Sequence, residues 1–265
     1  MLWRHEIRVI ALFLLAFGLH QAGIFVLGIN SFFGWLLSLM YVVVTLIAIL
    51  FIKGQRSRFS QHGFLLPGGV GRYLAVAVFF GFVYVFIIIF LPGAISGFDA
   101  LPGALLSLDT FLTGGSIVLA SIASETVFRG YVQTEVEADH GFYIALIVVS
   151  SMFALYMLPV TTYFAGDLTG ILRGLLPLLA ESVFLCAFFK ESKTLLCPIA
   201  FTATVEMLKV FTPLEALTGD YTLPFMIVTF IVLIPVMQSF VGDVRQQDER
   251  LDSTPVPDLE EDDAT

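Results

Sequence analysis

The feature that most constrains this chain is a series of long apolar stretches. A bilayer core about 30 Å thick is spanned by a helix of about 20 mostly apolar residues. Eight windows approach that length: 9–28, 33–52, 73–91, 112–132, 142–159, 171–189, 194–211 and 223–241. Hydrophobic residues make up 58% of the chain and charged residues only 13%, far from the balance of a soluble domain. The sequence predicts an all-α, polytopic membrane helix bundle of about eight transmembrane helices.

The basic residues predict how these helices are oriented. Lys and Arg gather in the cytoplasmic loops of membrane proteins. If all eight windows are spans, eleven of the thirteen basic residues fall on one side of the membrane. Only Arg173 and Lys209 fall on the other side. Because both ends of the chain belong to the basic side, we expect both termini to be cytoplasmic.

The acidic residues are concentrated at the carboxyl end. The net charge is −9, and the residues from Asp243 onward contribute −7 of it. This end also contains two prolines and too few apolar residues to form a core. We therefore predict a membrane-embedded domain over residues 1–242 and a disordered, acidic cytoplasmic tail over 243–265. No nucleic-acid partner is expected.

Charged side chains inside the predicted spans are candidates for function. Placing a charge mid-bilayer costs about 2.5–3.5 kcal/mol on insertion scales, so such residues usually face the bundle interior and find partners. Glu125 and Arg129 are spaced i and i+4 and share a helix face. Glu206 is followed three residues later by Lys209. Two interpretations of each pair remain open: a structural bridge that holds helices together, or part of a functional site.

The other polar residues of the spans have simpler interpretations. Glu181 stands alone in the sixth window, where an isolated glutamate can be neutral. His20, beside Gln21, is expected to form hydrogen bonds between helices. Cys186 and Cys197 are expected to be small buried hydrophobes. None of the four histidines has a partner at metal-ligand spacing, so no metal or other cofactor is expected.

One stretch resembles a known family. The run ETVFRGYVQTEVEADHG at 125–141, followed by IVVSSMFALYML at 147–158, is similar to the CPBP family of intramembrane proteins. That family includes CAAX prenyl endopeptidases and bacteriocin-processing or bacteriocin-immunity (Abi-like) proteins. The segment RFSQHGFLLPGG at 58–69 resembles the short amphipathic lead-in of the family. The resemblance is strongest over residues 55–211, and it implies the same eight-span plan and a multi-pass location in a prokaryotic plasma membrane.

The resemblance also implies a catalytic site made of three motifs that face one cavity. The first motif is a Glu-Glu pair with an arginine four residues after the second glutamate. The second is Phe-x-x-x-His, and the third is His-x-x-x-Asn or His-x-x-x-Asp. In the family, the first glutamate and the second-motif histidine activate water, and the third-motif pair stabilises the oxyanion. Such groups supply general base catalysis and electrostatic stabilisation of the transition state.

The first motif is only partly present in this chain. The position of the first glutamate is occupied by Ser124, whereas Glu125 and Arg129 match the second glutamate and the arginine. A serine hydroxyl is no base at neutral pH without a partner, and no histidine or lysine lies within a turn of Ser124. The retained pair is therefore expected to brace the fold.

The other two motifs have lost their histidines. Phe153 matches the second motif, but Met157 occupies its histidine position. The best placement of the third motif is PIAFTATVE at 198–206, which puts Thr202 at the histidine position and Glu206 at the asparagine position. Methionine neither accepts a proton readily nor binds a hard metal ion. General base catalysis is worth about 10²–10⁴-fold in rate, so its loss predicts little hydrolysis.

Three functions remain open from the sequence. The first is a CAAX-protease-like intramembrane endopeptidase, or hydrolase, in which Glu125 or Glu206 takes over as the base. The second is a non-catalytic relative, a pseudoenzyme, that binds a hydrophobic or lipid-modified peptide or a membrane protein in immunity, assembly or regulation. The third is an ion or solute transporter, since intramembrane carboxylates often mark ion paths. We expect a family homologue with weak or no peptidase activity, and the sequence leaves enzymatic activity open.

Overall fold

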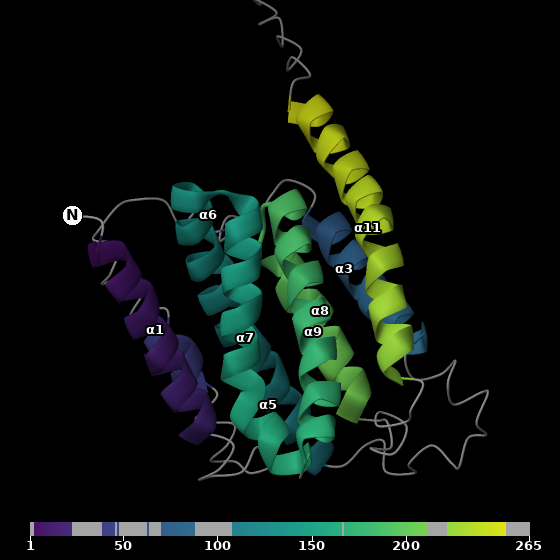
Figure 1. Cartoon of the computed structure of the whole chain (residues 1–265). Coiled ribbons are helices and arrows are strands. Elements are labelled where there is room, and N and C mark those ends of the chain that lie inside the picture. The colour runs from purple at the N-terminus through teal and green to yellow at the C-terminus, as the bar shows by residue number, and fades with distance from the viewer. Residues whose placement is uncertain are drawn as a thin grey trace, which may run out of the picture.

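The chain folds into a bundle of helices. The computed structural model describes residues 3–22, 39–45, 47, 63, 70–87, 108–165, 167–210 and 222–252. Its elements, which are side by side in Figure 1, are α1 (Trp3–Ala22), α3 (Val70–Val85), α5 (Leu108–Glu125), the π-helix η4 (Thr126–Gln133), α6 (Thr134–His140), α7 (Phe142–Ala165), α8 (Leu168–Ser192), α9 (Leu196–Val210) and α11 (Thr222–Asp252). Every regular element in these ranges is a helix, which confirms the prediction of an all-α fold.

The helices differ from the predicted windows mainly at their ends. The first begins at Trp3 instead of residue 9, and the second window is helical over 39–45, with its ends outside the described residues. The fourth window continues through η4 and α6, so the chain is helical from Leu108 to His140. The predicted interfacial connection 53–72 is described only at Gly63 and over 70–72, which begin α3.

The predicted disordered tail starts too early. Helix α11 continues to Asp252, so residues 243–252 are helical and the prediction of disorder over that part was wrong. The segment Arg245–Arg250 contains Arg, Gln and Glu, which are good helix formers, and the helix ends before the sequence STPVP, where proline would interrupt it. The remainder of the predicted tail, 253–265, lies outside the described residues.

The outer surface of the bundle is apolar, as expected in a bilayer. Phe142–Pro159 and Leu168–Ser192 are long and apolar enough to cross a membrane, and only 28% and 41% of their residues are buried inside the bundle. Shorter apolar helical segments cover Ile7–Ala22, Val70–Val85, Leu196–Leu208 and Val228–Val244. Large hydrophobic residues point outward on several helices; Ile147 is 64% exposed and Ile231 is 66% exposed. Helices that are apolar on all sides are typical of membrane spans.

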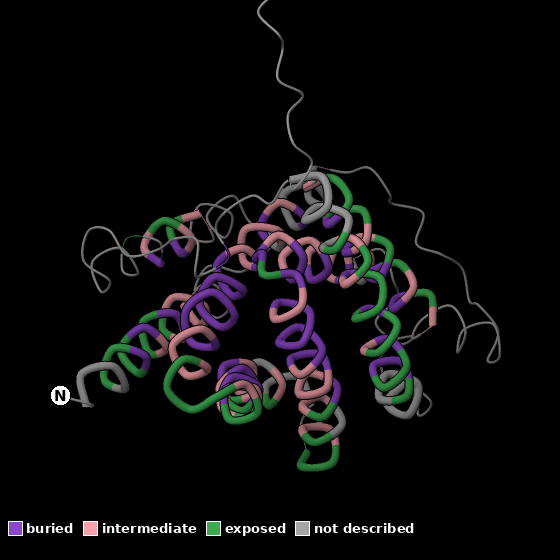
Figure 2. Tube along the Cα trace, turned by 90° about the horizontal axis from the view of Figure 1, so that it is seen from above, coloured by how far each residue is buried: buried purple, intermediate pink, exposed green. Residues whose placement is uncertain are grey.

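Two hydrophobic clusters form the interior. The first joins α3, α8, α9 and α11, and aromatic rings dominate it: Phe80, Tyr84, Phe184, Phe188, Phe201 and Phe230. The second joins α1, Tyr41, α5, η4 and α7 through Leu12, Val127, Phe128, Phe153 and Tyr156. Figure 2, seen along the bundle, shows buried residues on the inward faces of the helices and exposed residues outside. Cys186 of α8 also belongs to the second cluster, so α8 contributes to both clusters.

Close backbone contacts fix the relative positions of the helices. A side-chain carbon added at Gly81 in α3 would lie 2.9 Å from Thr204 in α9, so only glycine permits this approach. Small residues at such crossings are typical of membrane bundles. At one end of the bundle, the carbonyl of Gly63 accepts a hydrogen bond of 3.0 Å from the backbone N–H of Leu195, between α8 and α9.

Several chain segments that were predicted to share one side of the membrane lie at this same end. The start of α1, the end of α11 and α6 all lie toward the top of Figure 1. The ion pair between Lys190 near the end of α8 and Glu137 in α6 brings two further predicted same-side segments together. The orientation of the helices across the membrane and the cytoplasmic termini stay predictions. Arg129, which was counted among the basic residues of this side, is buried and not part of a loop.

Candidate functional site

The site is built on an unusual piece of backbone. Where α5 ends, the next eight residues, Thr126–Gln133, form a π-helix, and all of them are buried. A π-helix has i→i+5 hydrogen bonds and a wider turn, is rare, and is frequent at functional sites. The hydroxyl of Thr134, at the end of this segment, donates to the carbonyl of Arg129 at 3.4 Å and so supports the widened turn.

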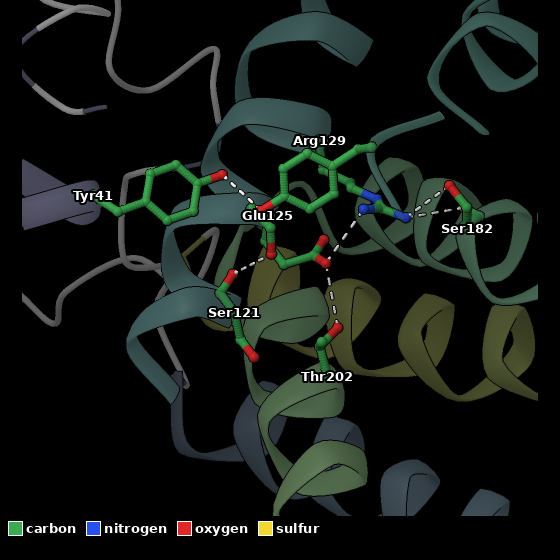
Figure 3. Close-up of polar contacts among 8 residues, drawn as sticks. Tyr41, Ser121, Glu125, Arg129, Ser182 and Thr202 are labelled. Carbon is green, nitrogen blue, oxygen red and sulfur yellow. Dashed lines mark hydrogen bonds and ion pairs between the residues drawn. The ribbon is translucent and has the colours of Figure 1, made fainter. Parts of the chain in front are cut away.

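Glu125 and Arg129 form the centre of the site. Arg129 Nη1 lies 3.3 Å from Glu125 Oε1, and both side chains are 0% exposed. Figure 3 shows how two other helices complete the pair. Thr202 in α9 donates its hydroxyl to Glu125 Oε1 at 3.3 Å, and Arg129 Nη2 donates to Ser182 Oγ in α8 at 2.9 Å. The pair therefore ties three helical segments together in the bundle interior.

Aromatic rings enclose the guanidinium. The Cζ atom of Arg129 lies 4.9 Å from the ring centre of Phe153 and 6.0 Å from that of Phe128. The two rings pack edge to face with their centres 5.3 Å apart. A cation over an aromatic face is attracted by the ring quadrupole, more strongly where water is excluded. Phe153 of the second motif thus contributes to the site as a wall for the buried charge.

The ion pair is one member of a series of contacts between η4, α6 and α8. Arg129 bonds to Ser182, Gln133 Nε2 donates to the carbonyl of Cys186 at 3.0 Å, and Lys190 Nζ lies 3.1 Å from Glu137 Oε1. Each contact joins residues 53 positions apart, and successive contacts advance by four residues on both helices. The two segments therefore run parallel in a fixed register, and we refer to these three contacts as the polar ladder.

A second polar group lies on the side of α1. The hydroxyls of Tyr41 and Tyr156 lie 3.2 Å apart, and Gln21 Nε2 donates to the carbonyl of Tyr156 at 3.1 Å. His20 stacks on the Tyr156 ring with ring centres 4.2 Å apart, and its Nε2 has no hydrogen-bond partner among the described residues. Interhelical hydrogen bonding by His20 stays a prediction, and the structure shows such a bond for the neighbouring Gln21.

The structure brings together only some of the six predicted site residues. Glu125, Arg129 and Thr202 are in direct contact. Ser124 is buried, but its hydroxyl donates to the carbonyl of Ser121 in the same helix at 3.2 Å. Met157 is half-buried and packs against the cluster that contains Phe128 and Phe153.

Glu206 lies one helical turn beyond Thr202 on α9 and is half-buried. Together with Glu181 it lies near the fully buried ring of Tyr84. The side chain of Lys209 lies outside the described residues, so its pairing with Glu206 stays a prediction.

Sequence reasoning missed three members of the site. Ser182 and Cys186 are ordinary residues of an apolar span, and nothing in their neighbourhood singles them out. Gln133 was detectable, because it continues the i, i+4 series of Glu125 and Arg129 by one more turn. Cys186 and Cys197 are free and buried, as predicted. Among the described residues, no group of three His, Cys, Asp or Glu side chains is placed to hold a metal ion.

Fold and site together define a membrane-embedded helix bundle with an interior Glu–Arg pair on the motif E-x-x-x-R. Residues 106–208, which include the whole site around Glu125, Arg129, Ser182 and Thr202, match the family model of the type II CAAX prenyl endopeptidase Rce1-like proteins. This part of the chain is an Rce1-like domain of the CPBP family, and the protein is an integral membrane protein. No curated protein matches the chain.

Proposed function

We propose that this protein is a CAAX-protease-like member of the CPBP family that binds a hydrophobic or lipid-modified peptide and hydrolyses it weakly or not at all. The family match supports this class of ligand, because the matching family model describes type II CAAX prenyl endopeptidases. The state of the motif residues supports the loss of hydrolysis.

One observation carries the proposal: the retained carboxylate is closed inside the bundle. A general base has to come within hydrogen-bond reach of the proton that it removes. Glu125 has no exposed surface, and its Oε1 atom is bonded to both Arg129 and Thr202. Glu125 therefore serves as the partner of a buried cation and not as an activator of water.

The replaced positions do not restore the missing chemistry. The Ser124 hydroxyl is occupied by a bond to the carbonyl of Ser121. Met157 presents a thioether to an aromatic cluster, and a thioether is only a weak acceptor. Thr202 stands where the family pattern has a histidine, and its hydroxyl is directed to Glu125. An oxyanion donor is worth about 10²–10³-fold in rate, so both parts of the catalytic apparatus are weakened.

We further propose that the end of the bundle that carries α6 and the α8–α9 turn faces the cytoplasm, with both termini there and about eight spans in all. The support is the gathering of Gly63, Leu195, Glu137 and Lys190 at one end, in segments that the basic residues assign to one side. A prokaryotic plasma membrane is the proposed location.

The test measures binding and cleavage on the same sample. The full-length protein is purified into lipid nanodiscs and mixed with a fluorescent peptide that ends in a prenylated CAAX sequence; the unprenylated peptide is the control. We expect saturable binding of the prenylated peptide, together with cleavage no faster than in empty nanodiscs. Cleavage at about 1 s⁻¹ or more, the range of ordinary enzymes, would refute the loss of activity. Absence of binding would refute the ligand class.

Residual hydrolysis is the second candidate, and one atom favours it. Glu125 Oε2 has no hydrogen-bond partner among the residues that the structure describes, so one acceptor of the carboxylate is uncommitted. If slow cleavage occurs and depends on this atom, Glu125→Gln abolishes it while peptide binding persists. Slow cleavage that survives Glu125→Gln excludes Glu125 as its base.

A further inference from the structure

Two neighbouring helices each contain a proline, and the two prolines lie at the same level of the bundle. Pro159 lies inside α7 and Pro177 inside α8. The two helices form a hairpin, in which a side-chain carbon added at Gly174 would lie 2.5 Å from Cγ2 of Thr161. Going away from the turn, Pro159 lies about 3 Å beyond Thr161 and Pro177 about 4.5 Å beyond Gly174, at 1.5 Å per helical residue. The levels of the two prolines therefore differ by only about 1.5 Å.

Each proline removes a helical hydrogen bond at this level. Proline has no backbone N–H, so the carbonyl four residues earlier loses its donor, and the proline ring also crowds that carbonyl. The carbonyls concerned are those of Leu155 in α7 and Arg173 in α8. Sharp bends in helices occur almost always at prolines or at a few comparable features. Both helices of the hairpin are therefore weakened within one turn of each other.

The end of the hairpin beyond the prolines is joined within itself. We refer to residues 161–165 of α7 and 168–176 of α8 as the hairpin tip; in Figure 1 they lie at the end of the bundle opposite α6. Asp167 caps the second segment by accepting a 2.7 Å hydrogen bond from the backbone N–H of Gly170. The close contact described above connects the two segments. The hairpin tip can therefore move as one unit.

The hairpin tip also lies outside the core. Among its described side chains none is buried, and Leu168 and Leu172 are 71% and 51% exposed. Pro177 is the first residue of α8 that is described as buried, and from Glu181 onward most of this helix belongs to the interior. Apolar burial thus fixes the hairpin on one side of the prolines and not on the other.

Two side chains support the weakened turn before Pro159. Gln21 Nε2 in α1 donates to the carbonyl of Tyr156 at 3.1 Å, and the hydroxyl of Thr161 donates to the carbonyl of Met157 at 3.0 Å. Neighbouring helices and Ser or Thr side chains typically satisfy backbone groups near prolines in membrane helices. Of these two bonds, only the one from Gln21 connects the turn to another helix.

We propose that the hairpin tip is a hinged unit that swings about Pro159 and Pro177, and that the bond from Gln21 to the carbonyl of Tyr156 holds the hinge in its present position. Helix α1 thereby acts as the latch of the hinge. The turn before the hinge carries Tyr156 and Met157, which pack in the second hydrophobic cluster, so the swing changes the packing on that side of the site. This movement is independent of whether the protein binds or cleaves a peptide.

The swing is measurable as a distance between two spin labels on the full-length protein in lipid nanodiscs. The labels are attached to Leu168→Cys in the hairpin tip and Ile231→Cys in α11, both exposed positions, in a background protein with Cys186→Ala and Cys197→Ala. Leu168 is about 14 Å along the helix from Pro177, so a bend of about 20° moves it by about 5 Å. We expect the background protein to show two distances, or one distribution broadened by about this amount.

Substitutions at the hinge and at the latch should have opposite effects. The double change Pro159→Ala, Pro177→Ala restores both backbone donors and should leave a single distance. Gln21→Met keeps the volume of the side chain but removes the donor, and Gln21→Asn has an amide too short to reach the carbonyl. Each should raise the ratio of the second distance to the first by about fivefold, the factor that corresponds to one hydrogen bond of ordinary net strength. The matched control is Gln133→Met, which removes the same kind of bond far from any proline and should change nothing.

A second pair of labels separates the hinge from a movement of the whole hairpin. Tyr143→Cys lies at the start of α7, on the other side of Pro159, and is 80% exposed. Its distance to Ile231→Cys should stay single in the background protein and in every variant. Equal broadening at Tyr143 and Leu168 would overturn the hinge, as would a Leu168 distribution that the double proline change leaves as it is. A distribution that neither Gln21 variant alters would overturn the latch.

Discussion

Arg129 Nη2 donates a 2.9 Å hydrogen bond to the hydroxyl of Ser182 on the neighbouring parallel helix α8, and the same guanidinium pairs with Glu125 on its own helix. The charge is therefore shared between two segments 53 residues apart in sequence. The side chains of Glu125 and Arg129 are both fully buried. When one of them is replaced, most of the cost in folding free energy therefore comes from the charge that stays buried without its partner. The first two predictions follow from this asymmetry.

Replacing Arg129 alone should be more damaging than replacing the whole ion pair. In Arg129→Met, Glu125 remains buried without its cation, and breaking a buried pair in this way costs about 3–5 kcal/mol. In the double variant Glu125→Leu, Arg129→Met, no charge is stranded, so the loss of folding free energy should be smaller than in the single variant. Reversible unfolding in mixed micelles measures both. A double variant that is less stable than Arg129→Met would contradict the expectation.

The contacts of the polar ladder should differ in strength according to their burial. Ser182→Ala removes a hydrogen bond to a buried charge, for which about 1.5–3 kcal/mol is typical. Glu137→Gln alters the ion pair to Lys190, whose side chains are 34% and 28% exposed, and pairs near water contribute about 0–1 kcal/mol. The same unfolding measurement compares the two variants at low and high salt. We expect Ser182→Ala to lower the folding free energy more than Glu137→Gln does. The opposite order would mean that the ion pair between Glu137 and Lys190 contributes more than the buried bond to Ser182.

Alanine substitutions at Gly63 and Gly141 test how tightly the connection before α3 packs against the bundle. Both have positive φ angles, +74° and +83°, which side chains other than glycine rarely adopt, so alanine is strained at either. Only at Gly63 would the added carbon also meet other atoms, at 2.6 Å from the Phe189 ring and 2.9 Å from the backbone nitrogen of Leu195. We expect Gly63→Ala to lower the thermal unfolding midpoint more than Gly141→Ala. Equal effects would show that the contact with the α8–α9 turn is loose.

If the replaced motif residues are the reason for the proposed lack of hydrolysis, restoring the family residues should create peptidase activity. The changes are Ser124→Glu, Met157→His, Thr202→His and Glu206→Asn, and they are made together on the chain that keeps Glu125 and Arg129. We expect cleavage of the prenylated peptide to rise by at least about 10², the lower contribution of a general base. The matched control carries the same four changes with glutamine at 124 instead of glutamate. Activity in that control would show that the added carboxylate is not the base.

The sequence was sufficient to predict the helical membrane bundle and the centre of the site. Long apolar windows predict helices whatever their packing, and a charge inside a span has to find a partner, so Glu125 and Arg129 stood out. The contacts with Ser182 and Thr202 depend on how α8 and α9 pack against η4, which no local pattern encodes. The end of α11 was missed for another reason: residues 243–252 are polar and acidic, yet their helix propensity lets the span continue beyond the apolar part.

The π-helix explains how the polar ladder stays straight. In an α-helix, four residues turn through about 400°, so a stripe of residues at i, i+4 and i+8 drifts by about 40° per step around the axis. In the wider π-helix, four residues fall short of a full turn, and the drift has the opposite sign. Residues 126–133 are π-helical and 134–140 are α-helical, so the two rotations offset each other. Removal of a single residue from 126–133 would therefore turn Glu137 around the helix axis and away from Lys190, while α5, which precedes the π-helix, keeps its place.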